Sequence, residues 1–320
     1  MSFVRTVLGD IASGELGVCY AHEHVIIDPS FTTQATPAFL LDNVARATTE
    51  LLQFRASGGQ AMIDSMPCDA GRNVVKLAVV SRATGVHLVA PTGLHLAQYY
   101  DLGHWGNFYT VEQLAGLFVA DINDGIDEHD YSGPLVKRTQ HRAGVIKIAT
   151  GSAFTKRDVN VFAAAAEAHL RTGAPILTHT EQGTLGLEQV VRLRDFGVDL
   201  RHVCISHLDR KPDLAYHRDI LASGVRVEYD SGFRWPAGRG NPTLELVMAL
   251  LPEFPGQIML GMDAARWTYW RSYGGQPGLS FLLKDFSEQL RECGLTDAQW
   301  QQMFVATPAA TYAFHPNPAS

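Results

Sequence analysis

Eight short apolar stretches recur along the chain, and most of them are separated by segments with the residue spacing of an amphipathic helix. Strands that alternate with helices predict a parallel sheet whose crossover connections are helical. A chain of 320 residues has the size of one barrel of eight such units with loop insertions. The expected strands are residues 16–20, 60–65, 86–93, 144–150, 175–180, 202–207, 225–230 and 257–263.

An open, doubly wound sheet would also give this alternation. However, the first strand is not followed by Gly-x-Gly-x-x-Gly, and the sequence contains no phosphate-binding loop. We therefore predict an α/β fold of the (β/α)8 TIM-barrel type, in which residues 1–320 form a single domain. A short hairpin over residues 6–14 is expected to cap the bottom of the barrel.

Charge and cysteine content narrow the class of protein. The net charge is −7 and the pI is about 6.0, so a nucleic-acid partner is not expected. The sequence shows no signal peptide and no apolar stretch of transmembrane length, so no membrane partner is expected either. The cysteines are widely spaced, which predicts reduced thiols in a cytoplasmic protein. They are Cys19, Cys68, Cys204 and Cys293.

Polar residues stand at the ends of several predicted strands. His22 and His24 follow the first strand, and residues two apart on an extended chain project from the same face. Two imidazoles on one wall can bind a metal ion from one side. His179, His207 and Asp263 end the fifth, sixth and eighth strands, and barrel active sites gather at such ends. One histidine there is usually a packed polar group, but this set is hard to explain as packing.

Lys147 lies inside the apolar strand 144–150, where an ammonium group is costly to bury. One interpretation is a buried ion pair with Asp263 or Glu23. In the other, desolvation and nearby cations depress the pKa of the amine, which then reacts with carbon dioxide. The resulting carbamate is an anion with two oxygens and can bridge two metal ions. The two interpretations remain open from the residues alone.

Five motifs together resemble the binuclear-metal phosphotriesterase family of the amidohydrolase superfamily. They occur in the order found in that family, and they span nearly the whole chain. The combination is specific, although His-x-His alone is a weak signal. The motifs are His22-x-His24, Val145-Ile146-Lys147-Ile148-Ala149, Thr178-His179-Thr180-Glu181, Ser206-His207-Leu208-Asp209 and Gly261-Met262-Asp263.

The resemblance implies a pair of divalent metal ions. Zinc is the default for nitrogen and oxygen ligands, while manganese, cobalt and iron are alternatives. It also implies that a bridging hydroxide is the nucleophile, that Asp263 orients it and takes its proton, and that Asp209 is a further catalytic candidate behind the ligands. The implied ligands are His22, His24 and Asp263 for the more buried ion, His179 and His207 for the more exposed ion, and Lys147, as N6-carboxylysine, for both.

Three loops are expected to select the substrate. The loop after the third strand is rich in aromatic residues, including Tyr99, and could wall a pocket. The loops after the seventh and eighth strands carry arginines, and arginine with a tyrosine hydroxyl suits an anionic group. Arg266 and Tyr269 resemble the phosphate-binding pair of family members that open phosphorylated sugar lactones. Arg234 falls near the position at which those members have a lysine. Arg239 is the alternative match for that position. Alternatively, these arginines pair with acids on neighbouring loops.

The sequence therefore predicts a metal-dependent enzyme that hydrolyses a small-molecule lactone, namely a polar or phosphorylated sugar lactone. The alternative is a lactonase or esterase for neutral substrates, such as acyl homoserine lactones or organophosphate triesters. A non-catalytic binding barrel is disfavoured because every ligand expected of the family is present. Dimers are common in the family, so a homodimer is one expectation, although the sequence does not give the oligomeric state.

Overall fold

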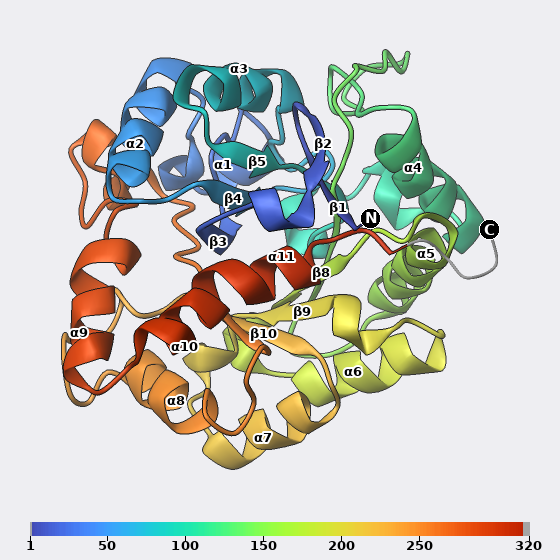
Figure 1. Cartoon of the computed structure of the whole chain (residues 1–320). Helices are drawn as coiled ribbons and strands as arrows, with labels where there is room; N and C mark the ends of the chain where they lie inside the picture. Colours follow the sequence, from blue (N-terminus) through green and yellow to red (C-terminus); the bar gives the residue numbers. More distant parts are fainter. Residues whose placement is uncertain (1, 316–320) are drawn as a thin grey trace.

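The computed structural model describes residues 2–315, in which a ring of helices surrounds parallel strands (Figure 1). Eight strand positions agree with the predicted ones, and the third is interrupted at Ala90, so that β5 and β6 are its two halves. The (β/α)8 prediction is confirmed. The barrel strands are β3 (Cys19–Glu23), β4 (Ala61–Asp64), β5 (His87–Val89), β6 (Pro91–Gly93), β7 (Val145–Thr150), β8 (Ile176–Thr180), β9 (Val203–Ser206), β10 (Arg226–Tyr229) and β11 (Ile258–Leu260).

The barrel closes between its last and first strands. β3, β4 and β5 form one hydrogen-bonded sheet, and β6 to β11 form the other. Beyond the end of β11, the Asp263 amide donates to the His22 carbonyl at 3.2 Å. The Glu23 carboxylate accepts from the amides of Met262 (2.7 Å) and Ala264 (3.3 Å). Glu23, which the sequence places opposite the histidine pair, thus fastens the last strand to the first.

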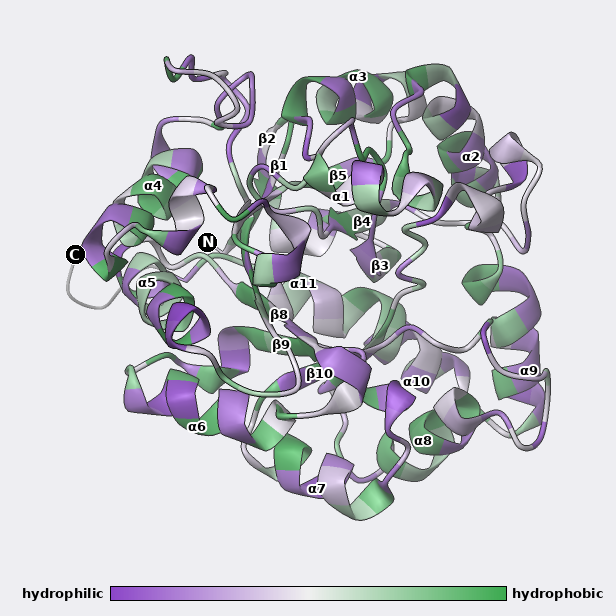
Figure 2. Cartoon of the chain, turned by 180° about the vertical axis from the view of Figure 1, so that it is seen from behind, coloured by the Kyte–Doolittle hydropathy of each residue, from purple (hydrophilic) through white to green (hydrophobic). Residues whose placement is uncertain are grey.

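The outer helices begin and end at residues suited to those positions. The side chains of Asn43, Asn73 and Asn241 cap the helices that follow them. α3 and α5 end at Gly85 and Gly173, which adopt positive φ angles of 68° and 72°. Several helices carry both hydrophilic and hydrophobic surfaces (Figure 2). The helices are α1 (Phe31–Ala35), α2 (Val44–Ala56), α3 (Val74–Thr84), α4 (Val111–Asn123), α5 (Lys156–Thr172), α6 (Gly186–Asp195), α7 (Leu214–Ala222), α8 (Pro242–Leu250), α9 (Ser287–Glu292), α10 (Asp297–Gln301) and α11 (Thr307–Thr311).

Both chain ends cover the same side of the barrel. A hairpin forms from β1 (Phe3–Thr6) and β2 (Gly9–Ala12), which pair antiparallel, so it begins three residues before the predicted range 6–14. The ring of Phe3 stacks on Phe314 with centroids 4.8 Å apart. In Figure 1, α11 lies across the near end of the barrel, and the hydroxyl of Tyr312 donates to the Ala21 carbonyl at 2.8 Å. This cover leaves the opposite end, where the strands finish, for the site.

The barrel interior changes character along the strands. Val145 and Leu177, near the strand starts, belong to one buried apolar cluster. Two residues further along the same strands and on the same face, the chain places Lys147 and His179. The opposite faces of the strands carry apolar residues that pack under the helices. Polar chemistry is therefore concentrated inside the barrel near the carboxyl ends.

Two predictions about the whole chain can be compared with the structure. Cys19, Cys68, Cys204 and Cys293 are all free, and burial raises the pKa of the Cys204 thiol to about 12. Within residues 2–315, the longest apolar helices fall short of what a bilayer crossing requires. Neither finding conflicts with the expectations from the sequence.

Candidate active site

A cavity of about 410 Å³ opens at the carboxyl ends of the strands. Most of the predicted site residues line it, although they come from distant parts of the chain. Lys147 lies in β7, and it is buried with the side chain only 1% exposed. The predicted residues that line the cavity are His22, His24, Tyr99, His179, His207, Arg234, Asp263, Arg266 and Tyr269.

Four imidazoles converge at the bottom of this cavity. The ring centroids of His22 lie 5.6 Å from those of His24 and 4.6 Å from those of His207, and His179 lies 4.5 Å from His207. The pairing of β3 with β4 shifts register between Tyr20 and Glu23. This irregularity lies in the part of β3 that carries His22, just before His24.

Burial favours the neutral form of three of these histidines. Burial lowers the pKa of His22 and His179, and it lowers that of His207 to about 3. A neutral imidazole keeps a lone pair, which is the form that binds a metal ion. The cluster is therefore ready to act as a set of nitrogen ligands near neutral pH.

Asp263 completes a group that can bind a metal ion. Its Oδ1 lies 3.2 Å from His24 Nε2 and 3.7 Å from His22 Nε2. One ligand atom from each of these three residues falls within 4.8 Å of the others. Asp263 and His207 have positive φ angles of 47° and 66°, which are uncommon for residues other than glycine and concentrate at functional sites.

Two arginines bind the carboxylates behind this group. Arg210 Nη2 lies 2.7 Å from Asp263 Oδ2 and 3.2 Å from Asp230 Oδ1. Arg234 Nη1 donates to the Asp230 carbonyl at 2.6 Å, and its Nη2 lies 3.3 Å from Asp263 Oδ2. Burial alone would raise the pKa of Asp263, but the hydrogen bond with His24 and the nearby cations hold it well below its usual value. For Arg234, the alternative of pairing with acids is therefore observed.

Lys147 has none of the partners considered for a buried ion pair. Its Nζ atom is buried and has no hydrogen-bond partner among the described residues. Glu23 is engaged by two backbone amides, and Asp263 by Arg210. Burial lowers the pKa of Lys147 to about 8, so far more of the amine is uncharged near neutral pH than in a lysine with the ordinary pKa, although most of it is still protonated.

Asp209 does not line the cavity. Its buried carboxylate accepts from the Ser231 amide at 2.8 Å and from Thr243 Oγ1 at 2.6 Å. These bonds support the loop after β10 instead of presenting the acid to a substrate. Arg239, the other candidate position in this loop, is also absent from the cavity lining.

Two cavity residues were missed in the sequence. His95 lies two residues after β6, with its ring centroid 4.8 Å from that of His179, and its Nδ1 accepts from the Leu96 amide at 2.8 Å. Arg210 follows the sixth-strand histidine by three residues. A signal existed for His95, because it stands at a strand end like the four predicted histidines. Nothing in the sequence indicates that Arg210 pairs with Asp230 and Asp263.

Asp230 was also missed, although it ends the predicted seventh strand. Its Oδ2 accepts a hydrogen bond from His207 Nδ1. Metal-binding histidines commonly donate their second ring N–H to a carboxylate, which fixes the tautomer. Asp230 thus leaves His207 Nε2 with its lone pair.

Comparisons with known proteins agree with this geometry. A sequence model of the phosphotriesterase family matches residues 2–312. A phospho-furanose lactonase of Mycoplasmopsis synoviae is 32% identical over 324 residues, which cover 98% of this chain and 92% of the relative. The crystal structure of an amidohydrolase from Mycoplasma synoviae matches with a TM-score of 0.93 and 31% identity, covering 98% of this chain and 92% of that one. A lactonase structure from Listeria monocytogenes matches with a TM-score of 0.89 and 28% identity, covering 98% and 100%.

Proposed function

Because this chain belongs to the phosphotriesterase family, whose members are metal-dependent hydrolases, we propose that it opens the ester ring of a phosphorylated sugar lactone. The name of the phospho-furanose lactonase relative supports this substrate class. The observation that carries the proposal is that the guanidinium group of Arg266 has no acidic partner. It lines the cavity, and no carboxylate pairs with it among residues 2–315.

Arg266 and Arg234 differ in their availability to a substrate. The guanidinium group of Arg266 lies over the ring of Phe39, 5.2 Å from its centroid, and remains exposed. Arg234 is held by Asp230 and Asp263. We assign the phosphate to Arg266 together with the hydroxyl of Tyr269, because an unpaired guanidinium can bind a phosphate bidentately without first losing an ion pair.

The residues present fit a pair of metal ions. Buried atoms without partners, Lys147 Nζ and His24 Nδ1, lie among neutral imidazoles and one carboxylate. Nitrogen and oxygen donors of this kind suit zinc, manganese, cobalt and iron. When bound, such ions lower the pKa of a water molecule and polarise the ester carbonyl. The proposed ligands are His22, His24 and Asp263 for one ion, His179 and His207 for the other, and carboxylated Lys147 for both.

The remaining residues prepare the reacting groups. We assign Asp263 as the proton acceptor, and Arg210 at its Oδ2 keeps that carboxylate ionised and oriented between turnovers. Neutral His95 carries its proton on Nε2, because Nδ1 accepts from the Leu96 amide. That proton can be donated to an oxygen of the lactone. Tyr99, whose ring centroid lies 4.1 Å from that of His95, forms the wall beside it.

One observation favours the alternative of a neutral substrate. Part of the cavity wall is apolar and includes Ile27, Phe39 and Met66. An acyl chain or the alkyl groups of an organophosphate triester could pack there.

A substrate panel tests the proposal against this alternative. The purified enzyme is assayed with sugar lactones with and without a phosphate group, an acyl homoserine lactone and an organophosphate triester. We expect kcat/KM for the phosphorylated lactones to exceed that of their unphosphorylated forms by about 100-fold, as two charge-assisted hydrogen bonds allow. This advantage should shrink as salt is raised. Equal values for the two forms would contradict a phosphate site.

A further inference from the structure

Glu228 lies at the centre of the barrel and was not singled out in the sequence. It stands on β10 two residues before Asp230, with the side chain 0% exposed. Neither of its carboxylate oxygens has a hydrogen-bond partner within residues 2–315. A buried carboxylate without donors is unfavourable, because water would solvate it far better. Its presence therefore calls for a positive or donating group at this place.

The group nearest to Glu228 is a proposed metal ligand. Glu228 Oε2 lies 3.6 Å from His22 Nδ1. The same nitrogen lies 2.9 Å from Ser206 Oγ. Nε2, on the other edge of the ring, faces Asp263. The Nδ1 edge of His22 thus faces two oxygen atoms, while the Nε2 edge faces the cavity.

Gly261 makes room for this arrangement. A Cβ atom at that position would lie 2.6 Å from Glu228 Oε1 and 2.6 Å from the His22 carbonyl oxygen. Such distances are sterically forbidden, so the carboxylate fits only because residue 261 has no side chain. The packing places Glu228 against the strand end that carries Asp263.

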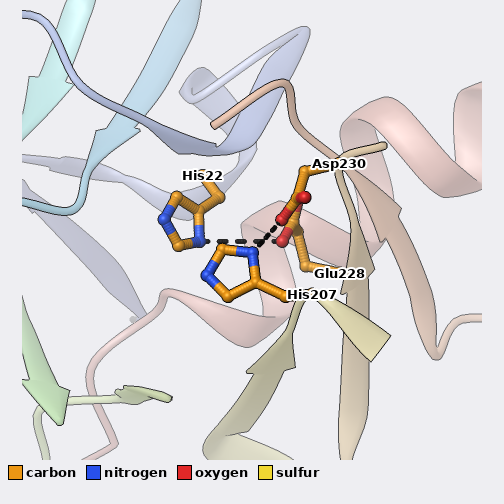
Figure 3. A group of neighbouring side chains, drawn as sticks. All are labelled: His22, His207, Glu228 and Asp230. Carbon is orange, nitrogen blue, oxygen red and sulfur yellow. Dashed lines mark hydrogen bonds and ion pairs between the residues drawn. The ribbon is translucent and has the colours of Figure 1, made fainter. Parts of the chain in front are cut away.

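The neighbouring histidine, His207, also has a carboxylate at its Nδ1 atom. Asp230 accepts from His207 Nδ1, and Glu228 approaches His22 Nδ1 from the same strand (Figure 3). Residues two apart on a strand share a face, so β10 directs both acids toward the pair of rings. Ligating histidines are generally oriented by a carboxylate on their second nitrogen.

We propose that Glu228 is a positioning residue for His22, which it holds, with Ser206, in the tautomer that carries the proton on Nδ1. The Nε2 lone pair then points toward the metal. This inference rests on the ligand role of His22 in the proposed function, but it does not depend on which lactone is the substrate.

The competing explanation makes Glu228 the counter-ion of Lys147. Both groups are buried and lack hydrogen-bond partners, and the carboxylate raises the pKa of the amine against the effect of burial. The described structure, however, contains no ion pair between them within 4.0 Å. The two explanations differ in the protein without metal, where a counter-ion would be needed and a positioning group would not.

The test compares wild type with Glu228→Gln in metal affinity and in stability. Each protein is reconstituted with zinc, and the affinity of each ion is measured by competition with a chromogenic chelator. We expect the ion assigned to His22, His24 and Asp263 to bind about 10–100-fold more weakly in the variant. Urea unfolding of the chelated proteins should show the variant to be at least as stable as wild type, because the amide replaces a buried carboxyl group that has no hydrogen-bond partner within residues 2–315.

Glu50→Gln is the matched control. Glu50 is another buried glutamate, but its carboxylate accepts from the amides of Ser272 (2.7 Å) and Leu279 (2.9 Å), so it has a structural role. This variant should unfold at lower urea with unchanged zinc affinity. If Glu228→Gln is insoluble, Glu228→Asp provides the comparison, since the shorter side chain withdraws the carboxyl group from His22. We expect the zinc affinity of this variant to fall as well.

The outcomes separate this inference from the proposed function. Zinc affinity of either Glu228 variant within about threefold of wild type would overturn the positioning role. A chelated Glu228→Gln protein that is markedly less stable than chelated wild type would show a counter-ion instead. Failure of wild type to bind zinc, manganese, cobalt or iron would refute the metal site itself. Inactivity on phosphorylated lactones with intact zinc binding would refute only the substrate.

Discussion

The guanidinium group of Arg210 lies 2.7 Å from Asp263 Oδ2 and 3.2 Å from Asp230 Oδ1, so one cation joins a proposed metal ligand to the acid that orients His207. Arg210→Met should lower kcat by about 10–100-fold, the range expected for a charge-assisted hydrogen bond. Steady-state kinetics on one phosphorylated lactone measures it. Arg210→Lys, which keeps the charge, should lose less. A normal kcat in the methionine variant would mean that Asp263 does not need this cation.

Lys147→Ala removes the proposed bridge between the metal ions. The variant should bind fewer than two ions, and its kcat should fall by more than the ~10–100-fold typical of groups that only support a ligand. A short carboxylic acid added to the assay should restore part of the rate. Metal analysis and kinetics measure these effects, with the exposed Lys156→Ala as control. Unchanged metal content would refute the carbamate.

Asp263→Asn tests the proton acceptor. The amide has nearly the same size but cannot take up a proton, so kcat should fall by about 10²–10⁴-fold, the usual contribution of a general base. Circular dichroism should show an intact fold, because the hydrogen bond from the Asp263 backbone amide to His22 remains. A kcat close to wild type would exclude this role.

Arg266→Ala should raise KM for phosphorylated lactones by about 10–100-fold, because a bidentate ion pair with the phosphate is lost. KM for the unphosphorylated lactones should stay nearly constant. Arg239→Ala is the matched control, since Arg239 is exposed and outside the cavity. Equal changes in KM for both kinds of lactone would remove the phosphate site.

A histidine pair on the covered side of the barrel predicts a pH effect on stability. The rings of His202 and His315 stack with centroids 3.5 Å apart, and burial lowers the pKa of His202 to about 4. The unfolded chain therefore binds more protons between pH 4 and 6.5. The contribution of neutral His202 to the free energy of unfolding is complete above pH 6.5 and is lost as the pH falls toward 4.

His202→Phe keeps the stacked ring and removes the proton site. Between pH 7 and 4.5, its free energy of unfolding should fall by about 1–2 kcal/mol less than that of wild type. This difference already allows for the solvent that screens the neighbouring Asp199. Urea unfolding of chelated protein at several pH values measures this difference. Parallel curves for the two proteins would contradict the assignment.

The fold was predictable because barrel strands have a strong apolar pattern in the sequence. Each of them is apolar on the face that packs under the helices, and stretches such as 144–150 and 175–180 carry that signal without help from tertiary contacts. In the C-terminal segment the structure forms α9 and α10 as separate helices, and between them Gly294 has a φ of 100°.

The residues of the site also differ in how well the sequence predicted them. Residues at strand ends, such as His179 and Asp263, could be predicted because the architecture gathers them. The partners of Arg234 could not be identified, since they depend on loop conformation, which has no sequence period. Glu228 and Asp230 had a signal in principle. They alternate with the apolar residues of β10, and because the outer face must be apolar, the acids had to face inward.

Gly261 has a consequence for engineering this enzyme. The residue lies outside any expected contact with substrate, yet a methyl group there would collide with Glu228 and with the backbone of His22. Saturation libraries aimed at new substrates should therefore keep position 261 fixed and diversify the loops that carry Arg266 and Tyr99. Variants at 261 would be recovered as inactive protein, and their defect would be misread as lost specificity.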